Sequence, residues 1–157
     1  MKFFRTAALE SFTMTISLIV GAVAAGLVAM LFFNSDGDHW IILLTVAIMM
    51  AAVVSSYLMI PKLSVDAEAV YITNRFVKIR IPVSAIKMAE RFNRIGFNIR
   101  TFGVGGLFGY FGYFNGNDVW YVTNIKKKVK ITLKSGKIYM ISPENPEGFI
   151  KELNIPR

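Results

Sequence analysis

The chain has no cysteine and a single histidine among its 157 residues. The absence of cysteine excludes disulfides, thiolate metal sites and cysteine nucleophiles, and it leaves the redox compartment open. The single histidine, His39, lies beside Asp36 and Asp38 in a short polar link. That setting is more typical of a solvated turn than of a metal site. We therefore expect neither a metal nor a cofactor.

Charged side chains are absent from two long stretches near the N-terminus. At a rise of about 1.5 Å per residue, residues 12–33 would span about 33 Å, enough for a hydrocarbon core of about 30 Å. A second uncharged stretch, residues 40–60, ends just before Pro61, and the polar link between the stretches turns the chain back. We therefore predict a transmembrane hairpin over residues 1–61, with spans at about 12–33 and 40–60.

The charges that flank these stretches predict their orientation. Lys2, Arg5 and Lys62 lie on one side, whereas the link contains Asp36 and Asp38 but no lysine or arginine. Basic residues favour the cytoplasmic side, so both termini should be cytoplasmic. A cleaved signal peptide is the alternative, but the apolar run continues well beyond the possible cleavage site.

Neither expected span contains an ionisable side chain, which argues against a transporter because ion and proton paths in membranes use such groups. Small residues recur instead at every fourth position of each span. Such residues let helices approach closely in lipid. They fit packing inside the hairpin, or alternatively contact with a second copy or a partner membrane subunit. The small residues are Ser17, Gly21, Ala25 and Ala29 in the first span and Ala47, Ala51 and Ser55 in the second.

After Pro61 the sequence changes to short alternations of apolar and polar residues, which are typical of half-buried strands. Residues 142–147 then carry helix-start signals, and an apolar stripe follows them. Short strands closed by one helix are typical of the pleckstrin-homology (PH) architecture. We therefore predict an α+β membrane protein, in which the hairpin precedes a PH-like small β-barrel or sandwich over residues 62–157. The expected strands cover residues 63–65, 70–73, 76–81, 83–91, 118–123, 128–133 and 137–141, and helix is a weaker alternative for 83–91.

Several short motifs of this region combine glycine, tyrosine or proline at fixed spacings: Arg100-Thr101, the glycines at 103, 106, 109 and 112, Tyr121-Val122-Thr123, Val129-Lys130-Ile131, Gly136 to Tyr139, Ser142-Pro143, and Pro146 to Phe149. Together they resemble the bacterial PH-domain proteins that carry N-terminal membrane helices. The resemblance covers residues 63–153 and extends to the hairpin only in general terms. It implies a PH-like fold in the bacterial inner (plasma) membrane. The family offers no catalytic motif, so we expect a protein that is not an enzyme.

Residues 100–114 combine five glycines with six aromatic residues. Glycine inside a helix or strand costs about 0.5–1 kcal/mol relative to alanine, so neither element is favoured. The glycine spacing lacks the lysine and helix of a phosphate loop. One interpretation is a bend or bulge packed with aromatic rings between strands. The other is a loop or distorted strand pair that places rings against the bilayer or the cytoplasmic end of the hairpin. The rings concerned are Phe102, Phe108, Tyr110, Phe111 and Tyr113.

Positive charge is concentrated after the hairpin, where residues 62–157 carry sixteen basic and seven acidic side chains. The basic residues form either a solvated strand face or a contact with anionic lipid headgroups. Nucleic-acid binding would need aromatic rings among the lysines, and the rings cluster elsewhere. No carboxylates are paired by spacing for general acid–base catalysis. The candidate binding residues are Lys78, Arg80, Lys126, Lys128, Lys130 and Lys134.

These features favour a non-enzymatic, membrane-anchored PH-like adaptor that binds anionic headgroups or a protein or peptide partner at the inner leaflet. The alternative is an accessory or regulatory subunit of a larger membrane complex, assembled through the small-residue helix faces. In either role we expect membrane lipids as partners, together with a protein partner or a second copy, and no nucleic acid.

Overall fold

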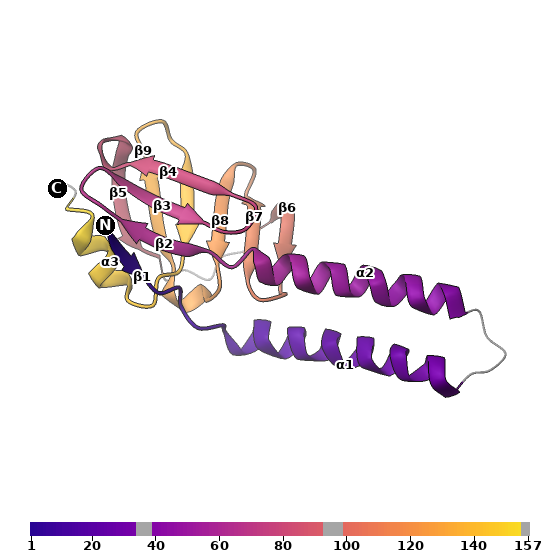
Figure 1. Cartoon of the computed structure of the whole chain (residues 1–157). Helices are drawn as coiled ribbons and strands as arrows, with labels where there is room; N and C mark the ends of the chain where they lie inside the picture. The colour runs from indigo at the N-terminus through magenta and orange to yellow at the C-terminus, as the bar shows by residue number, and fades with distance from the viewer. Residues whose placement is uncertain (34–38, 93–98, 155–157) are drawn as a thin grey trace.

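A computed structural model describes residues 1–33, 39–92 and 99–154 of the chain. Two long helices, α1 (Ser11–Phe33) and α2 (His39–Leu58), lie side by side and join a β domain at one end (Figure 1). The helix bounds agree with the predicted spans to within two residues. The polar link between the helices, with Asp36 and Asp38, lies outside the described residues.

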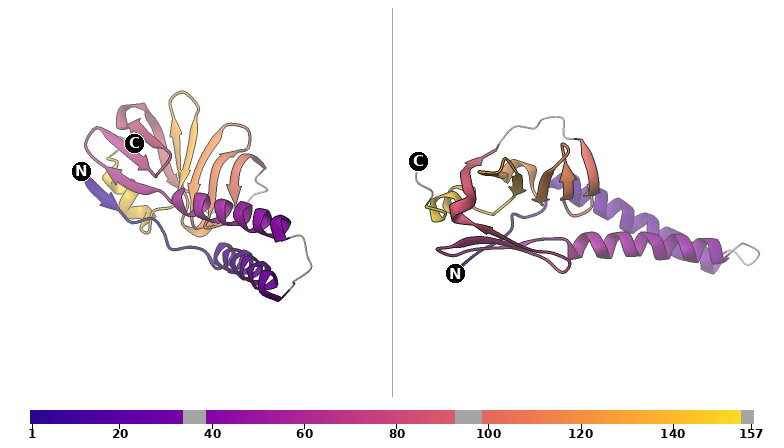
Figure 2. Two further views of the ribbon diagram at one scale, coloured as in Figure 1. Left: turned by 45° about the vertical axis from the view of Figure 1, so that its right-hand side comes forward. Right: turned by 90° about the horizontal axis from the view of Figure 1, so that it is seen from above.

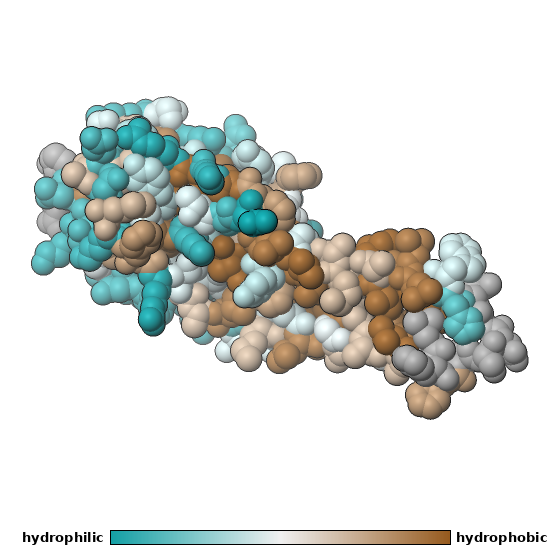
Figure 3. Space-filling model, in the orientation of Figure 1, coloured by the Kyte–Doolittle hydropathy of each residue, from teal (hydrophilic) through white to brown (hydrophobic). Residues whose placement is uncertain are grey.

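Both helices are long and apolar enough to cross a membrane, and little of either is buried inside the protein. Hydrophobic residues cover the helical part of the face seen in Figure 3, whereas hydrophilic residues gather on the β domain. A core helix of a soluble protein would instead hide most of its apolar surface. The prediction of two apolar helices that could span a membrane is therefore confirmed.

The contact between α1 and α2 does not use the small-residue faces. The buried residues of the two helices are Thr13 and Ala24 on α1 and Ser56 on α2. A Cβ atom added to Gly21 would have no other heavy atom within 4 Å. Most of the small residues therefore lie outside the contact between α1 and α2. Exposed positions of this face are Gly21, Ala25, Ala29, Ala47 and Ala51, with Ser17 and Ser55 half-buried.

The first ten residues lie against the β domain. Strand β1 (Lys2–Phe4) pairs antiparallel with β2 (Lys62–Val65), which directly follows the hairpin. The Thr123 hydroxyl donates a hydrogen bond to the Ala7 carbonyl at 2.6 Å. The predicted boundary after Pro61 assigned these residues to the hairpin, whereas the structure places them with the domain. Both ends of the hairpin therefore meet the same domain.

Two sheets form the domain, and their strands cross at a steep angle (Figure 1). One sheet has the order β1-β2-β3-β4, and the other has the order β5-β9-β10-β8-β7-β6. Among the described strands, β8 and β10 pair in parallel, and the other neighbouring strands pair antiparallel. The remaining bounds are Ala69–Thr73 (β3), Lys78–Pro82 (β4), Ile86–Arg91 (β5), Arg100–Gly105 (β6), Tyr110–Phe114 (β7), Asp118–Val122 (β8), Val129–Leu133 (β9), Ile138–Ile141 (β10) and Pro146–Glu152 (α3), with 3-10 turns at Val83–Ala85 (η1) and Ile125–Lys127 (η2).

The main core lies between the two layers, which Figure 2 shows from above in its right-hand panel. Apolar side chains of both sheets fill it, and Phe149 of α3 is fully buried at one end. Asn145 caps α3 by accepting a hydrogen bond from the Gly148 amide, and Pro146 follows at the first helical position. Across the described residues the strands do not close into a barrel. The predicted PH-like fold is therefore confirmed in its sandwich form.

Two predicted strands start later than expected because a local turn precedes each of them. Asn74 accepts hydrogen bonds from the Phe76 and Val77 amides, so β4 begins only at Lys78. Pro82 precedes η1, so β5 begins at Ile86. The helix alternative considered for residues 83–91 applies only to this short turn.

Residues 100–114 form the β6–β7 hairpin. Gly103 lies directly opposite Gly112 in the register, and both have φ values in the left-handed half of the map, at 123° and 126°. Residues with a Cβ rarely adopt such values, which explains glycine in the middle of both strands. The stretch is therefore a strand pair with glycine at two facing positions and a shift of register between Arg100 and Phe102.

Candidate membrane-interface site

The turn of the β6–β7 hairpin contacts the domain-side ends of both long helices. The Phe108 amide donates a hydrogen bond to Ser17 Oγ of α1 at 3.2 Å. The Phe108 ring meets the Tyr57 ring of α2 edge-on, with 5.7 Å between the ring centroids. A Cβ at Gly106 would lie 3.6 Å from Ile16 Cδ1. This turn thus joins the domain to the helix pair.

The five aromatic residues singled out from the sequence occupy different environments. Phe111 is 1% exposed and belongs to the main core. Phe108 and Tyr110 are half-buried, and Phe108 contacts the helices. Phe102 and Tyr113 are 75% and 43% exposed, respectively. Phe111 therefore fits the interpretation of rings packed between strands, and Phe108 fits the interpretation of rings against the end of the hairpin.

The turn between β3 and β4 closes the C-terminal end of α2. The last carbonyls of a helix have no partner within the helix and need one elsewhere. Here the Arg75 amide donates to the Leu58 carbonyl at 3.4 Å, and the Asn74 side-chain amide donates to the Met59 carbonyl at 3.0 Å. These two hydrogen bonds hold the chain in place between the end of α2 and the start of β2.

A cationic groove of about 600 Å³ lies at this junction. Lys62, Arg75 and Lys78 line it, and none of them has an ion-pair partner among the described residues. Other cations of the described chain, such as Lys2 and Arg91, are paired with glutamates. A helix C-terminus also favours nearby positive charge. The remaining lining residues are Tyr57, Leu58, Ile60, Pro61, Thr73 and Asn74.

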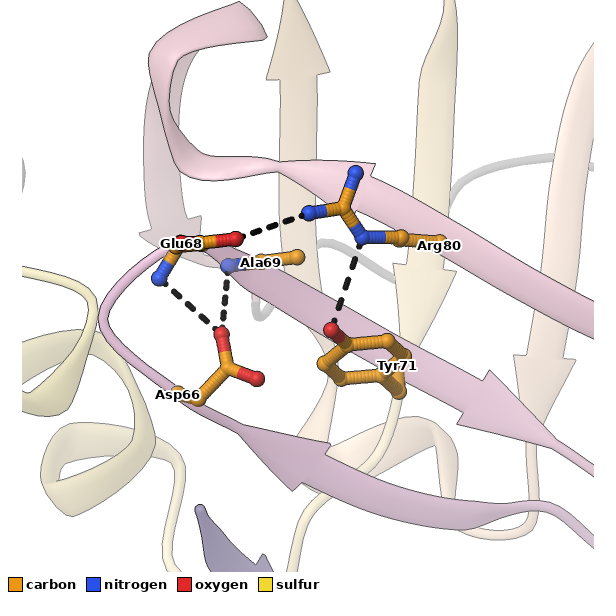
Figure 4. Close-up of polar contacts among 5 residues, drawn as sticks. All are labelled: Asp66, Glu68, Ala69, Tyr71 and Arg80. Atoms are coloured by element: carbon orange, nitrogen blue, oxygen red, sulfur yellow. Dashed lines mark hydrogen bonds and ion pairs between the residues drawn. The ribbon is translucent and has the colours of Figure 1, made fainter.

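Of the predicted basic residues, Lys78 lies in the cationic groove, and its neighbour Arg80 belongs to a separate polar cluster (Figure 4). Arg80 forms an ion pair with Glu68 at 3.1 Å and donates a hydrogen bond to the Tyr71 hydroxyl at 3.4 Å. Asp66 accepts hydrogen bonds from the Ala69 and Glu68 amides, which lower the pKa of its carboxyl group. These contacts organise the β2–β3 turn, so the structure gives Arg80 a local partner.

Lys128 is buried rather than exposed on the expected strand face. It precedes β9, and its side chain is 1% exposed. The Nζ atom lies 5.0 Å from the Phe92 ring centroid and 5.1 Å from the Trp120 ring. Burial lowers the pKa of Lys128, and the negative charge of Glu10 opposes that shift. Lys128 therefore lies inside the domain and makes cation–π contacts with these two rings.

The other three predicted cations are distributed over the domain. Lys126 lies in η2 and is exposed, Lys130 lies on β9 with Nζ 5.5 Å from the Phe92 ring, and Lys134 lies exposed in the β9–β10 turn. The six predicted residues thus do not form one continuous face.

Sequence reasoning missed Lys62 and Arg75 as site residues. Lys62 served only as an indicator of orientation, and Arg75 lies in a turn with no other basic residue beside it. The available signal was position: Lys62 follows the second apolar stretch directly, where cations meet the headgroup region. Arg75 joins it only through the pairing of β2 with β3 and of β3 with β4.

The crossed sheets, the closing helix α3 and the two apolar helices define a PH-like domain joined to candidate membrane helices. A family model described as the bacterial PH domain matches residues 61–155, which is more than half of the chain. The chain therefore belongs to the bacterial PH domain family, as its motifs predicted. No curated protein and no solved structure matches it.

Proposed function

We propose that α1 and α2 cross the bacterial inner membrane with both termini and the PH-like domain in the cytoplasm. In this role the protein is a non-enzymatic adaptor, and the cationic groove binds anionic lipid headgroups of the inner leaflet. The observation that carries the proposal is the groove itself, since three cations that have no acidic ion-pair partner among the described residues gather where α2 ends. Tyr57, which is exposed at the same place, is of the residue type enriched at headgroup level.

The expected strength of this contact follows from its charge. Each lysine or arginine near an anionic leaflet contributes about 1 kcal/mol, and the effect declines beyond a Debye length of about 8–10 Å. Because α2 would hold the groove at the membrane surface, its three cations stay within that distance. Lys126, Lys130 and Lys134 lie on other parts of the domain and should contribute less.

The experiment compares two triple variants of the full chain in nanodiscs that contain phosphatidylcholine and phosphatidylglycerol. Replacing Lys62, Arg75 and Lys78 by glutamine should lower the preference for retained phosphatidylglycerol, measured by native mass spectrometry, by about tenfold or more. The control replaces Lys126, Lys130 and Lys134 by glutamine and makes the same change in net charge. An equal loss in both variants, or no loss in the first, would contradict a headgroup site in the groove.

A second candidate function is that of an accessory subunit or homo-oligomer, and the exposure of the small-residue faces favours it. Close-packed helix contacts in lipid are enriched in such residues. Here five of them lie on the outside of the hairpin, where another helix can reach them. On this reading the hairpin assembles with a second copy or a partner membrane subunit.

Replacing Gly21 by leucine tests this second candidate. Because a Cβ there meets no atom within 4 Å, the hairpin and the β domain should keep their stability. The assembly should be lost, as measured by crosslinking in membranes and by the mass of the detergent-extracted species. Ala24→Leu is the matched control, since Ala24 is 5% exposed and a larger side chain there should disturb the hairpin itself. An unchanged assembly in Gly21→Leu would count against the candidate.

A further inference from the structure

A second groove of about 320 Å³ opens between the two sheets on the inner side of the β3–β4 turn. Met59 at the end of α2 lines one part of it, together with Phe76 and Val77 of the turn. Phe102 and Tyr113 of the β6–β7 hairpin form another part. We call this the inter-sheet groove. Its walls are mainly apolar, and its size lies at the lower end of the range of small-molecule sites.

The register of the six-stranded sheet explains the floor of this groove. Tyr113 is paired with Val119, and Val119 is paired with Tyr139, so the three side chains lie in one row across β7, β8 and β10. Phe111 and Tyr121 form the neighbouring row on the same face. The four-stranded sheet crosses this face at a steep angle, and residues of both rows line the groove. The groove therefore results from the way the two layers cross.

One part of the inter-sheet groove is polar and positively charged. Lys137 lines it, with Nζ 5.3 Å from the centroid of the Tyr139 ring. Burial raises the pKa of Tyr121, and the neighbouring Tyr113 and Tyr139 raise it further, so the Tyr121 hydroxyl stays neutral and can donate a hydrogen bond. No aspartate or glutamate is among the described residues that line the groove. The charge of the site thus suits an anion.

We propose that the inter-sheet groove binds a long-chain fatty acid, with its carboxylate at Lys137 and the tyrosine hydroxyls and its alkyl chain among Phe76, Val77 and Met59. A carboxylate fits because lysine and hydroxyl donors form charge-assisted hydrogen bonds with it. A single alkyl chain fits because the groove is narrow and apolar. Free fatty acids partition into bilayers, and the contact of the groove with the end of α2 gives such a chain a route from the membrane.

This inference goes beyond the headgroup contact and does not depend on it. Among the described residues, Asn74 alone lines both grooves. The cations of the first site do not line the second. A failure of one site in the experiments therefore leaves the other testable.

The test uses the full chain in phosphatidylcholine nanodiscs and palmitate that carries a photoreactive diazirine at the end of its chain. Crosslinks should map by mass spectrometry to Met59, Phe76 or Val77, and unlabelled palmitate should compete. Lys137→Met should lower the competing affinity of palmitate about tenfold, because it removes the cation and keeps an unbranched side chain of similar length. The affinity of hexadecanol, which has no charge, should be the same in both proteins.

Lys134→Met is the matched control, since Lys134 is exposed in the same turn and does not line the groove. It should bind palmitate as the unmodified protein does. Crosslinks spread along α1 and α2 alone would show partition into the bilayer and overturn the proposal. Equal palmitate affinity in Lys137→Met, or competition by hexadecanol as strong as that by palmitate, would also overturn it.

Discussion

Gly112→Ala is expected to destabilise the β domain by roughly 3 kcal/mol or more, through backbone strain and a steric clash together. The φ value of 126° is one that alanine rarely adopts. The added Cβ would lie 2.3 Å from the Phe102 carbonyl oxygen and 2.8 Å from the Gly103 Cα. Both atoms belong to the backbone of β6, so relief of the clash requires the two strands to separate.

The matched control is Gly116→Ala in the turn between β7 and β8. Gly116 also has a positive φ, at 90°, but a Cβ there would meet no atom within 4 Å. It should cost only about 1 kcal/mol, from conformational strain alone. Denaturant unfolding in detergent, followed by Trp120 fluorescence in a Trp40→Phe background, measures both variants. Equal losses in the two would contradict the close approach of β6 and β7.

Gly103 and Gly112 also show a limit of predicting this fold from the sequence. The composition of residues 100–114 argued against a regular strand, yet β6 and β7 are paired over most of their length. Propensity misled here because Gly103 and Gly112 face each other, and each leaves the space that the other's backbone fills. Only the register reveals this arrangement, and the register is a property of two segments together.

The alternation of apolar and polar residues predicted the strands well where a strand has one buried face. The structure places β2, β3 and β8 within one residue of the predicted ranges 63–65, 70–73 and 118–123. It failed for Lys128, which precedes β9 and turns inward between two aromatic rings. The alternation rule holds only while the backbone is a strand.

Local sequence patterns did not predict contacts between segments that are far apart in the sequence. Strand β1 is three residues long, and the whole hairpin lies between it and its partner β2 in the sequence. The cationic groove depends in the same way on bringing Arg75 beside Lys62. The rotation of α1 against α2 is also a tertiary property, so a stripe of small residues could not show whether it faced inward or outward.

The aromatic residues of the β6–β7 hairpin differ in burial, and the second large effect on stability is expected for Phe111→Ala. Phe111 is 1% exposed in the main core, and its ring packs over the turn, since a Cβ at Gly109 would lie 2.8 Å from Phe111 Cζ. Removal of a buried phenyl ring costs about 3–5 kcal/mol, because the transfer free energy is lost and the remaining cavity collapses only in part. The same unfolding measurement should show this loss as a lower midpoint with little change in slope.

Phe102→Ala is the control within the same hairpin and changes the same type of side chain. Phe102 is 75% exposed, so its removal should alter the free energy of unfolding by less than about 0.5 kcal/mol. Phe102 also lines the inter-sheet groove, and its loss should therefore weaken palmitate crosslinking while the domain stays folded. If both variants unfolded alike, the assignment of Phe111 to the core and of Phe102 to the groove would be wrong.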